Sequence, residues 1–206
     1  LRQDKLQGVS DFANQLDAWD EQLANAAVPI VRSRRWFLQE LSENSSREYA
    51  AISENPDEPF SLFYVGPLAQ SDAPYEQMLA GLRRNREEDR RRMYTTFGPH
   101  RDDVSLQLFG RDLRAMGSQG QLRTAVLSMK LGEIRLIEKE MGESPTLLLD
   151  DVFSELDAKR RNALFKSAAP LQTFITCTDR QDAAGARADC FLRVTPTPDG
   201  TVLSRE

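Results

Sequence analysis

The stretch that most constrains the fold is a short apolar run, residues 146–149, which ends in the adjacent carboxylates Asp150 and Asp151. A run this short, preceded by Gly142 and Pro145, is typical of a buried parallel strand and not of a helix. Ligands of open α/β sheets bind at the carboxyl ends of such strands. Two carboxylates at that edge suit a hard cation and an attacking water, as phosphoryl transfer requires. A core strand followed by a solvated turn is the alternative interpretation.

The residues after this strand predict an α/β layer. Asp157 is placed to cap a helix that runs to about Phe165, and residues 171–176 and 191–194 are two further apolar strand candidates. The alternation of strand and helix indicates a mostly parallel sheet with flanking helices. We expect no further regular element beyond about Gly200.

A glycine-rich turn opens the helix that is predicted before the acidic strand. Ser118 is placed to cap this helix and Gly142 to end it. Gly117 and Gly120 let backbone N–H groups approach a ligand closely, and the start of a helix carries partial positive charge. With Ser118 and Gln119 as side-chain donors, the turn could bind a phosphate. A Ser-capped helix after a glycine turn, without any ligand, is common, and these residues taken alone favour it.

The N-terminal part of the chain is predicted to be helical. Its apolar residues recur in alternating steps of three and four, which indicates a long helix over residues 5–28 against a helical partner. The members of this seam are Val9, Phe12, Leu16, Trp19, Leu23, Ala26 and Ile30. Pro29 is expected to kink or break the helix, and a second helix follows to about residue 52. The pattern suggests an antiparallel arm, and an ordinary helical bundle fits it as well.

The composition of the chain changes near residue 94, where we place a domain boundary. Residues 1–93 form the predicted helical arm domain, which contains a short aromatic and β-branched strand at residues 60–65. A helix with an arginine-rich tail to Arg92 completes this domain. Residues 94–206 combine short strands, glycines and tight turns, as expected for the α/β lobe.

Bulk composition restricts the class of protein. The chain has 206 residues, of which 29% are charged and 40% hydrophobic, and this is typical of a globular protein. No apolar run approaches the ~20 residues of a membrane span, and the first residues lack a signal core, so we expect a cytoplasmic protein. Cys177 and Cys190 lack the spacing of a zinc site and are expected to be thiols.

The charge distribution does not decide whether the chain binds nucleic acid. The net charge of −5 argues against a uniformly basic nucleic-acid binder, although arginines cluster at residues 32–35 and 83–92. The second cluster is interleaved with acidic residues at helical i,i+4 spacing. It is therefore either a solvated helix face or a track for phosphates.

Taken in chain order, three motifs resemble the distal lobe of an ABC-type P-loop ATPase head. Residues 117–121 correspond to the signature, residues 146–151 to the Walker B strand and residues 154–157 to the D-loop. Together with the Gly-Pro-His-Arg-Asp-Asp turn at residues 98–103, they are similar to the RecF family of bacterial DNA replication and repair proteins. The resemblance covers most of the chain, and its motifs are specific.

The resemblance implies a role for each acidic residue of the strand. Asp150 would help to hold Mg²⁺, usually through water. Asp151 stands where most relatives have a catalytic Glu, and it would orient or deprotonate the attacking water.

The resemblance also implies a dimer interface with ATP sandwiched between two subunits. The signature residues, which would bind the nucleotide of the opposite subunit, are Ser118, Gln119, Gly120 and Gln121. The D-loop residues at the interface are Ser154, Glu155 and Asp157.

The family implies DNA and protein partners as well. RecF-like proteins bind DNA in an ATP-dependent way during recombinational repair, recognise gapped or single-strand/duplex junction DNA, and dimerise on ATP. They work with RecR and RecO to help load RecA, and they feed the SOS response. Arg101 is a candidate DNA contact because it lies in a charged turn next to the lobe.

Two departures from the family limit this expectation. The chain contains no G-x-x-x-x-G-K-[ST] phosphate loop, which in the family belongs to an N-terminal lobe. We therefore expect a C-terminal part of RecF that does not hydrolyse ATP alone. Residues 176–179 also offer no switch histidine, and Thr178 or Asp179 would have to replace it. With Asp in place of Glu at Asp151, slow turnover is expected.

Two other classes of function remain as alternatives. The arm and its arginine clusters could form a module that binds DNA or a mediator protein without nucleotide. The chain could also be a head fragment of an SMC-type chromosome ATPase. The short arm disfavours this last possibility, because an SMC coiled coil would be far longer.

Overall fold

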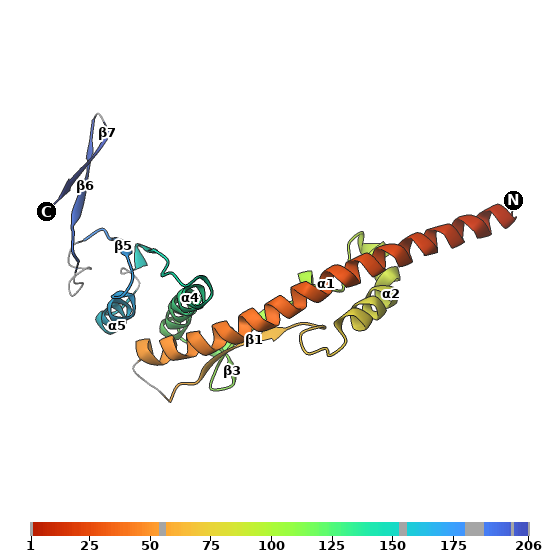
Figure 1. Ribbon diagram of the computed structural model, residues 1–206, viewed down its shortest axis with the longest axis horizontal. Helices are drawn as coiled ribbons and strands as arrows, with labels where there is room; N and C mark the ends of the chain where they lie inside the picture. The colour runs from red at the N-terminus through yellow and green to blue at the C-terminus, as the bar shows by residue number, and fades with distance from the viewer. Residues whose placement is uncertain (1, 54–56, 153–155, 180–187, 199, 206) are drawn as a thin grey trace.

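The computed structural model describes residues 2–53, 57–152, 156–179, 188–198 and 200–205, with side chains in the first helix described from Gln15 onward. That helix, α1 (Arg2–Ser53), runs without interruption along the long axis of the molecule (Figure 1). The helix predicted over residues 5–28 is present, but the break predicted at Pro29 is wrong. Pro29 and Asn25 are exposed, so water can bond the Asn25 carbonyl that has no N–H partner at position 29.

The arm is formed by α1 and α2 (Pro74–Arg92), which run in opposite directions. Arg35 donates a 2.7 Å hydrogen bond to the carbonyl of Ser71, just before α2 begins. Arg86, near the end of α2, pairs with Asp17 at 2.6 Å. The later residue of α1, Arg35, contacts the start of α2, and the earlier residue, Asp17, contacts its end. The two helices are therefore antiparallel, as predicted for the arm. The arm is built from α1 and α2, however, and not from the two halves of the first 52 residues.

The seam predicted over residues 5–30 is not the buried side of α1. The side chain of Trp19 is 62% exposed, and those of Leu23 and Ile30 are each 43% exposed. The buried apolar positions in this part of the helix are Ala24, Ala27 and Val31. Small residues of this kind let neighbouring elements approach closely, but they contribute little to a hydrophobic pattern. The predicted helical partner of the seam is therefore not seen among the described residues, and Val9 and Phe12 lie outside the described side chains.

A three-stranded antiparallel sheet lies beside α1, in the order β1 (Phe60–Val65), β2 (Asp103–Leu108) and β3 (Arg111–Asp112). The predicted strand at residues 60–65 is confirmed. Tyr49 of α1 stacks on Phe60 with ring centroids 4.9 Å apart, so helix and sheet share a core. The short helices η1 (Pro99–Arg101) and α3 (Leu113–Met116) precede β2 and follow β3.

The α/β part consists of α4 (Gln119–Met141), β4 (Leu147–Asp150), α5 (Ala158–Ala168) and β5 (Thr173–Thr176). The two strands are parallel, and this confirms the predicted fold class. Helix α4 lies so close to α1 that a Cβ on Gly132 would be 2.6 Å from Ser45 Oγ. Gly142 ends α4 with a φ of 72°, as predicted.

The parallel pair is covered on one face only. Leu147 and Leu149 are buried, whereas Leu148 is 71% exposed and Phe174 of β5 is 56% exposed. The prediction of a buried strand therefore holds for one face only, because no described element covers the outer face of these two strands.

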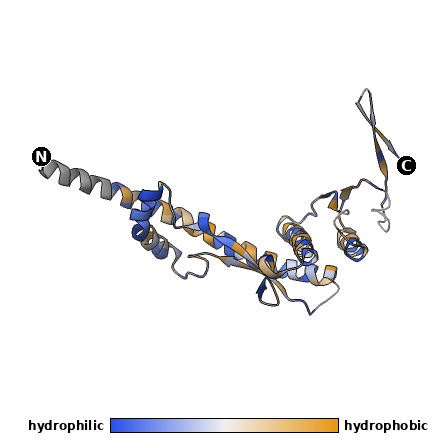
Figure 2. Cartoon of the chain, turned by 180° about the vertical axis from the view of Figure 1, so that it is seen from behind, coloured by the Kyte–Doolittle hydropathy of each residue, from blue (hydrophilic) through white to orange (hydrophobic). Residues whose placement is uncertain are grey.

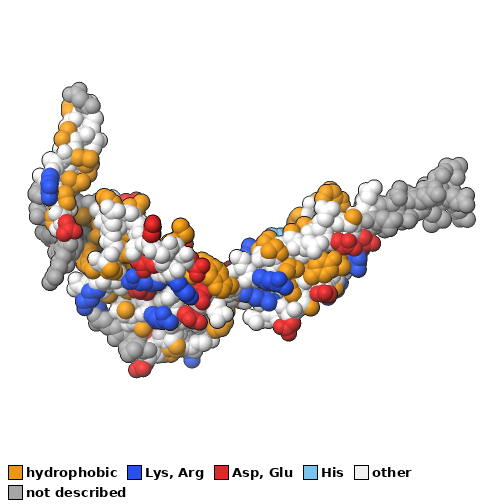
Figure 3. All heavy atoms as spheres, viewed as in Figure 1, with side chains coloured by type: hydrophobic (Ala, Val, Ile, Leu, Met, Phe, Trp, Pro, Cys, Tyr) orange, Lys and Arg blue, Asp and Glu red, His pale blue; other side chains and the backbone are white. Residues whose placement is uncertain are grey.

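The last two strands, β6 (Leu192–Thr197) and β7 (Gly200–Arg205), form an antiparallel hairpin. The predicted strand at residues 191–194 therefore does not join the parallel sheet, and a regular strand follows where none was expected. Pairing with the next segment of chain requires only a short loop, which is entropically cheap. Hydrophobic and hydrophilic residues are mixed along the hairpin (Figure 2), and hydrophobic side chains lie on its surface (Figure 3). None of the described helices is long and apolar enough to cross a membrane.

Candidate functional site

The acidic residues lie at the carboxyl edge of the parallel pair, as predicted, and Thr176 holds both of them. Asp150 ends β4 and is the register partner of Thr176, which ends β5. The Thr176 hydroxyl donates to the Asp150 carboxylate and accepts a 3.1 Å hydrogen bond from the backbone N–H of Asp151. Asp151 has a φ of 48°, in the left-handed region that non-glycine residues seldom occupy. The turn at this edge is thus locally constrained.

This edge fits a partial magnesium site. Among the described residues, no cluster of three His, Cys, Asp or Glu side chains could hold a metal ion. Mg²⁺, however, commonly keeps several waters and takes only one or two carboxylates from the protein, with substrate phosphates supplying the rest. Asp150 is exposed and is oriented by Thr176, so it suits that limited role. Sequence reasoning did not assign Thr176 to the site, although the last residue of the next parallel strand lies level with Asp150.

The signature turn forms the start of α4, with Ser118 as its cap. Ser118 Oγ accepts from the backbone N–H of Gln121 at 3.2 Å, and Gln121 Oε1 accepts from the backbone N–H of Ser118 at 2.9 Å. This capping box confirms the predicted cap. Because the Ser118 oxygen is the acceptor in this bond, its hydroxyl hydrogen remains available to a ligand. Ser118 and Gln119 are both exposed at this end of the helix.

Asp157 caps α5, as predicted. Its carboxylate accepts a 2.8 Å hydrogen bond from the backbone N–H of Arg160 and pairs with the Arg160 guanidinium. The backbone N–H of Arg160 is the main reason why the pKa of Asp157 lies below its usual value. The other predicted D-loop residues, Ser154 and Glu155, lie outside the described residues.

Arg160 connects the two helix starts. Its Nε donates to Thr124 Oγ1 at 2.8 Å, and Thr124 Oγ1 donates to the carbonyl of Gly120 at 2.8 Å. A Cβ on Gly120 would lie 3.1 Å from Arg160 Nη2, so the glycine leaves room for the guanidinium. The signature turn and the Asp157 cap are therefore joined by one side chain. No motif in the sequence indicated this link, and the only signal was an arginine three residues after a capping aspartate.

A cavity of about 300 Å³ opens beside this link. It is bounded by the end of α1 and the starts of α4 and α5, and its lining residues are Tyr49, Ile52, Ser53, Glu58, Ser118, Gln121, Thr124, Lys159 and Arg160. Burial, together with the neighbouring Glu58 carboxylate, raises the pKa of Tyr49 to about 12. The tyrosine is neutral at physiological pH. The cavity is lined both by α1 of the arm and by the signature turn.

Arg101 belongs to a different part of the molecule. It lies at the end of η1, is exposed, and holds its guanidinium carbon 5.7 Å from the centre of the Tyr94 ring. The structure thus divides the predicted residues into three groups. Asp150 and Asp151 meet at the sheet edge, the signature lies beside Asp157, and Arg101 lies at the end of η1, just before β2. The predicted substitutes for the switch histidine, Thr178 and Asp179, are exposed.

Comparison with curated proteins finds relatives over most of the chain. The DNA replication and repair protein RecF of Alkaliphilus oremlandii is 43% identical over 168 residues, which are 79% of this chain and 46% of the relative. RecF of Herpetosiphon aurantiacus is 40% identical over 184 residues, 88% of this chain and 47% of the relative. The chain spans about half the length of the curated relatives it matches. No family model matches the chain.

Solved structures agree with these relatives. The recombination mediator protein RecF-ATP in the RecFOR pathway superposes with a TM-score of 0.78 at 32% identity, covering 94% of this chain and 52% of that one. A structure of SMC ATPases superposes with a TM-score of 0.51 at 16% identity, covering 85% of this chain and 89% of that one, and indicates a shared fold only. The resemblance to RecF predicted from the motifs and the ATPase-head fold are both confirmed.

Proposed function

We propose, from the premise that this chain is a partial RecF-type sequence, that it supplies the distal half of an ATP-binding site in a DNA repair protein. The observation that carries the proposal is the exposed, Ser118-capped start of α4 in the same lobe as the acidic edge at Asp150 and Asp151. The start of α4 can bind an anion, and the two carboxylates can orient water and a cation. The other half of the site, with a phosphate loop, belongs to sequence that this chain does not contain.

The two carboxylates have separate tasks in this proposal. Asp150, oriented by Thr176, would help to hold Mg²⁺. Asp151 orients the attacking water or accepts its proton, and the hydrogen bond from its backbone N–H to Thr176 holds its position. Bound magnesium neutralises charge on the phosphates. Aspartate is shorter than the usual glutamate, so turnover is slow, and this chain alone does not hydrolyse ATP.

The signature acts in trans in this proposal. Ser118, Gln119, Gly120 and Gln121 bind the nucleotide of a second subunit, and ATP therefore drives homodimer formation. The names of the relatives, DNA replication and repair protein and recombination mediator protein, support a role in recombinational repair. The protein acts in the cytoplasm at gapped or junction DNA, feeds the SOS response, and works with RecR and RecO to load RecA.

Replacing Ser118 in a RecF-length protein tests the trans arrangement. We expect Ser118→Arg to abolish ATP-dependent dimerisation while monomers still bind ATP, because the arginine fills the surface that meets the partner's phosphate. Light scattering with and without ATP measures the dimer, and a fluorescent ATP analogue measures binding. Normal dimerisation of this variant would remove the signature assignment. Lys166→Ala, at an exposed position on α5, is the matched control.

Replacing Asp151 tests the chemistry separately. Asp151→Asn in the same protein should slow ATP hydrolysis and prolong the dimer, because the amide cannot accept the proton. Unchanged turnover would show that Asp151 takes no part in the reaction.

A second candidate function is a nucleotide-independent module that binds DNA or a mediator protein. The observation in its favour is the arginine-rich end of α2, where three basic residues occupy the last turn. ATP dependence distinguishes the two functions, since this module would bind DNA equally well without nucleotide. The SMC alternative is disfavoured, because the matched relatives at 40% identity or more are RecF proteins.

A further inference from the structure

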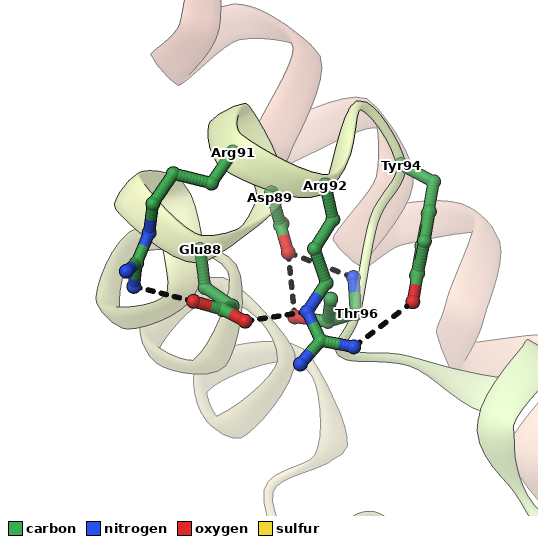
Figure 4. A network of polar contacts seen from close by, with 6 residues as sticks. All are labelled: Glu88, Asp89, Arg91, Arg92, Tyr94 and Thr96. Atoms are coloured by element: carbon green, nitrogen blue, oxygen red, sulfur yellow. Dashed lines mark hydrogen bonds and ion pairs between the residues drawn. The ribbon is translucent and has the colours of Figure 1, made fainter.

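The end of α2 presents a tyrosine on a well-supported turn. Met93 ends the helix in the left-handed conformation with a φ of 61°, and this turns the chain at Tyr94. The carboxylate of Asp89 accepts hydrogen bonds from the backbone N–H, at 2.8 Å, and the hydroxyl of Thr96 (Figure 4). His100 Nε2 lies 2.7 Å from the carbonyl oxygen of Thr95. Tyr94 therefore sits on a fixed turn and still remains 46% exposed.

Two guanidinium groups lie close to the Tyr94 ring. Arg101 lies 5.7 Å from the ring centre, and Arg92 donates a 3.2 Å hydrogen bond to the Tyr94 hydroxyl. Arg92 also pairs with Glu88, which pairs with Arg91 as well (Figure 4). We call Glu88, Arg91, Arg92, Tyr94 and Arg101 the arm-tip patch.

The arm-tip patch carries more positive than negative charge. Glu88 is shared by Arg91 and Arg92, and Arg101 has no carboxylate partner among the described residues. Asp89, whose carboxylate accepts the hydrogen bonds of Thr96, adds one nearby negative charge, and the charges of Arg91, Arg92 and Arg101 still exceed those of Glu88 and Asp89. The ion pairs within α2 alone would suit a solvated helix face, but they do not account for an exposed aromatic ring with one guanidinium at its hydroxyl and another near its centre. In a chain of net charge −5, this is a local exception.

We propose that the arm-tip patch binds single-stranded nucleic acid, with a base stacked on Tyr94 and phosphates paired with Arg92 and Arg101. Proteins that bind single strands combine stacking aromatics with guanidinium groups in this way. An acidic protein segment would satisfy the arginines but has no flat group for the ring. The inference rests on the DNA-binding part of the proposed function and is independent of its ATP-dependent part.

The test uses the 206-residue chain without nucleotide. Fluorescence anisotropy follows a labelled oligothymidylate, a duplex of equal length and a labelled polyglutamate peptide at two salt concentrations. We expect the single strand to bind more tightly than the duplex, because its bases are free to stack. Tyr94→Ala should weaken that binding about tenfold or more, whereas Tyr94→Phe keeps the ring and binds nearly normally. Circular dichroism verifies that each variant is folded.

Two further variants separate phosphate contacts from general charge. Arg101→Gln should lower the salt dependence of binding by about one unit of slope, since one phosphate contact is lost. Arg47→Ala removes an exposed arginine elsewhere on α1 and should change the affinity far less.

Three results would overturn the inference. They are no binding of the oligonucleotide at low salt, equal binding by Tyr94→Ala and the native chain, and Tyr94-dependent binding of polyglutamate in place of the oligonucleotide. A RecF-length protein that fails to dimerise with ATP would contradict the proposed ATP switch and leave this site intact.

Discussion

The two sheets of this chain expose similar apolar side chains, but the exposure has different meanings. In the antiparallel sheet, Phe63 of β1 is 46% exposed, and in the parallel pair Phe174 of β5 is 56% exposed. Antiparallel sheets commonly leave one face in water, whereas parallel sheets are covered on both faces. The exposure in the first sheet is therefore ordinary, whereas none of the described elements covers the outer face of the second. This agrees with a chain that spans about half the length of its relatives.

The largest expected effect distinguishes the two faces of β1. Phe60→Ala should lower the free energy of unfolding by about 3–5 kcal/mol, because Phe60 is buried against Tyr49. Phe63→Ala, on the exposed face of the same strand, should cost far less. Urea denaturation followed by circular dichroism measures both variants. Equal losses would mean that the first sheet is not one-sided.

The next effect concerns the contact that joins the arm to the parallel side. Gly132→Ala places a Cβ 2.8 Å from the backbone nitrogen of Ser45, which cannot move without shifting α1. We expect a loss of about 1–3 kcal/mol in urea denaturation. Glu140→Ala, at an exposed position on the same helix, is the control. A stable Gly132→Ala protein would show that α1 and α4 are less closely packed than described.

A smaller effect tests the Asp157 cap at the start of α5. Asp157→Ala removes the helix cap and should cost about 1 kcal/mol at neutral pH. Because the folded state lowers the pKa of Asp157, this stabilisation is present above the unfolded-state pKa and is lost as the pH falls through the folded-state pKa. The difference between native and variant melting temperatures should therefore shrink in acid. A constant difference across pH would contradict the role of the carboxylate.

The smallest effect tests the missing cover directly. Phe174→Ser in this chain should change the stability by less than about 0.5 kcal/mol, since the side chain already faces water. We expect the same substitution to destabilise a RecF-length protein clearly, because we infer that further sequence covers the outer face there. Thermal unfolding of both proteins makes the comparison. An equally small effect in the long protein would mean that the parallel pair needs no cover.

Local signals in the sequence predicted much of the fold. Ser118, Asp157 and Gly142 marked helix ends correctly, because caps and left-handed glycines act through neighbouring backbone groups. The parallel pairing of β4 with β5 followed from the alternation of strands and helices. The domain boundary near residue 94 stays a prediction.

Features that depend on contacts between distant parts of the chain were not predicted from the sequence. Pro29 did not break α1, because exposure at that turn supplies solvent for the unpaired carbonyl. The buried side of α1 depends on alanines whose importance comes from close approach and not from hydrophobicity. Arg160 and Thr176 were missed, since each acts through a residue brought near by tertiary structure.

The central claim is that this lobe serves a nucleotide held by another subunit, and mixing two impaired RecF-length variants tests it most directly. Ser118→Ala lacks the signature hydroxyl, and Asp151→Asn lacks the base. In a mixed dimer, one nucleotide meets an intact Asp151 on its own subunit and an intact Ser118 on the partner. We predict that the mixture hydrolyses ATP faster than either variant does alone. If mixed dimers form, as native mass spectrometry can verify, and hydrolysis does not rise above that of either variant, the trans arrangement is wrong.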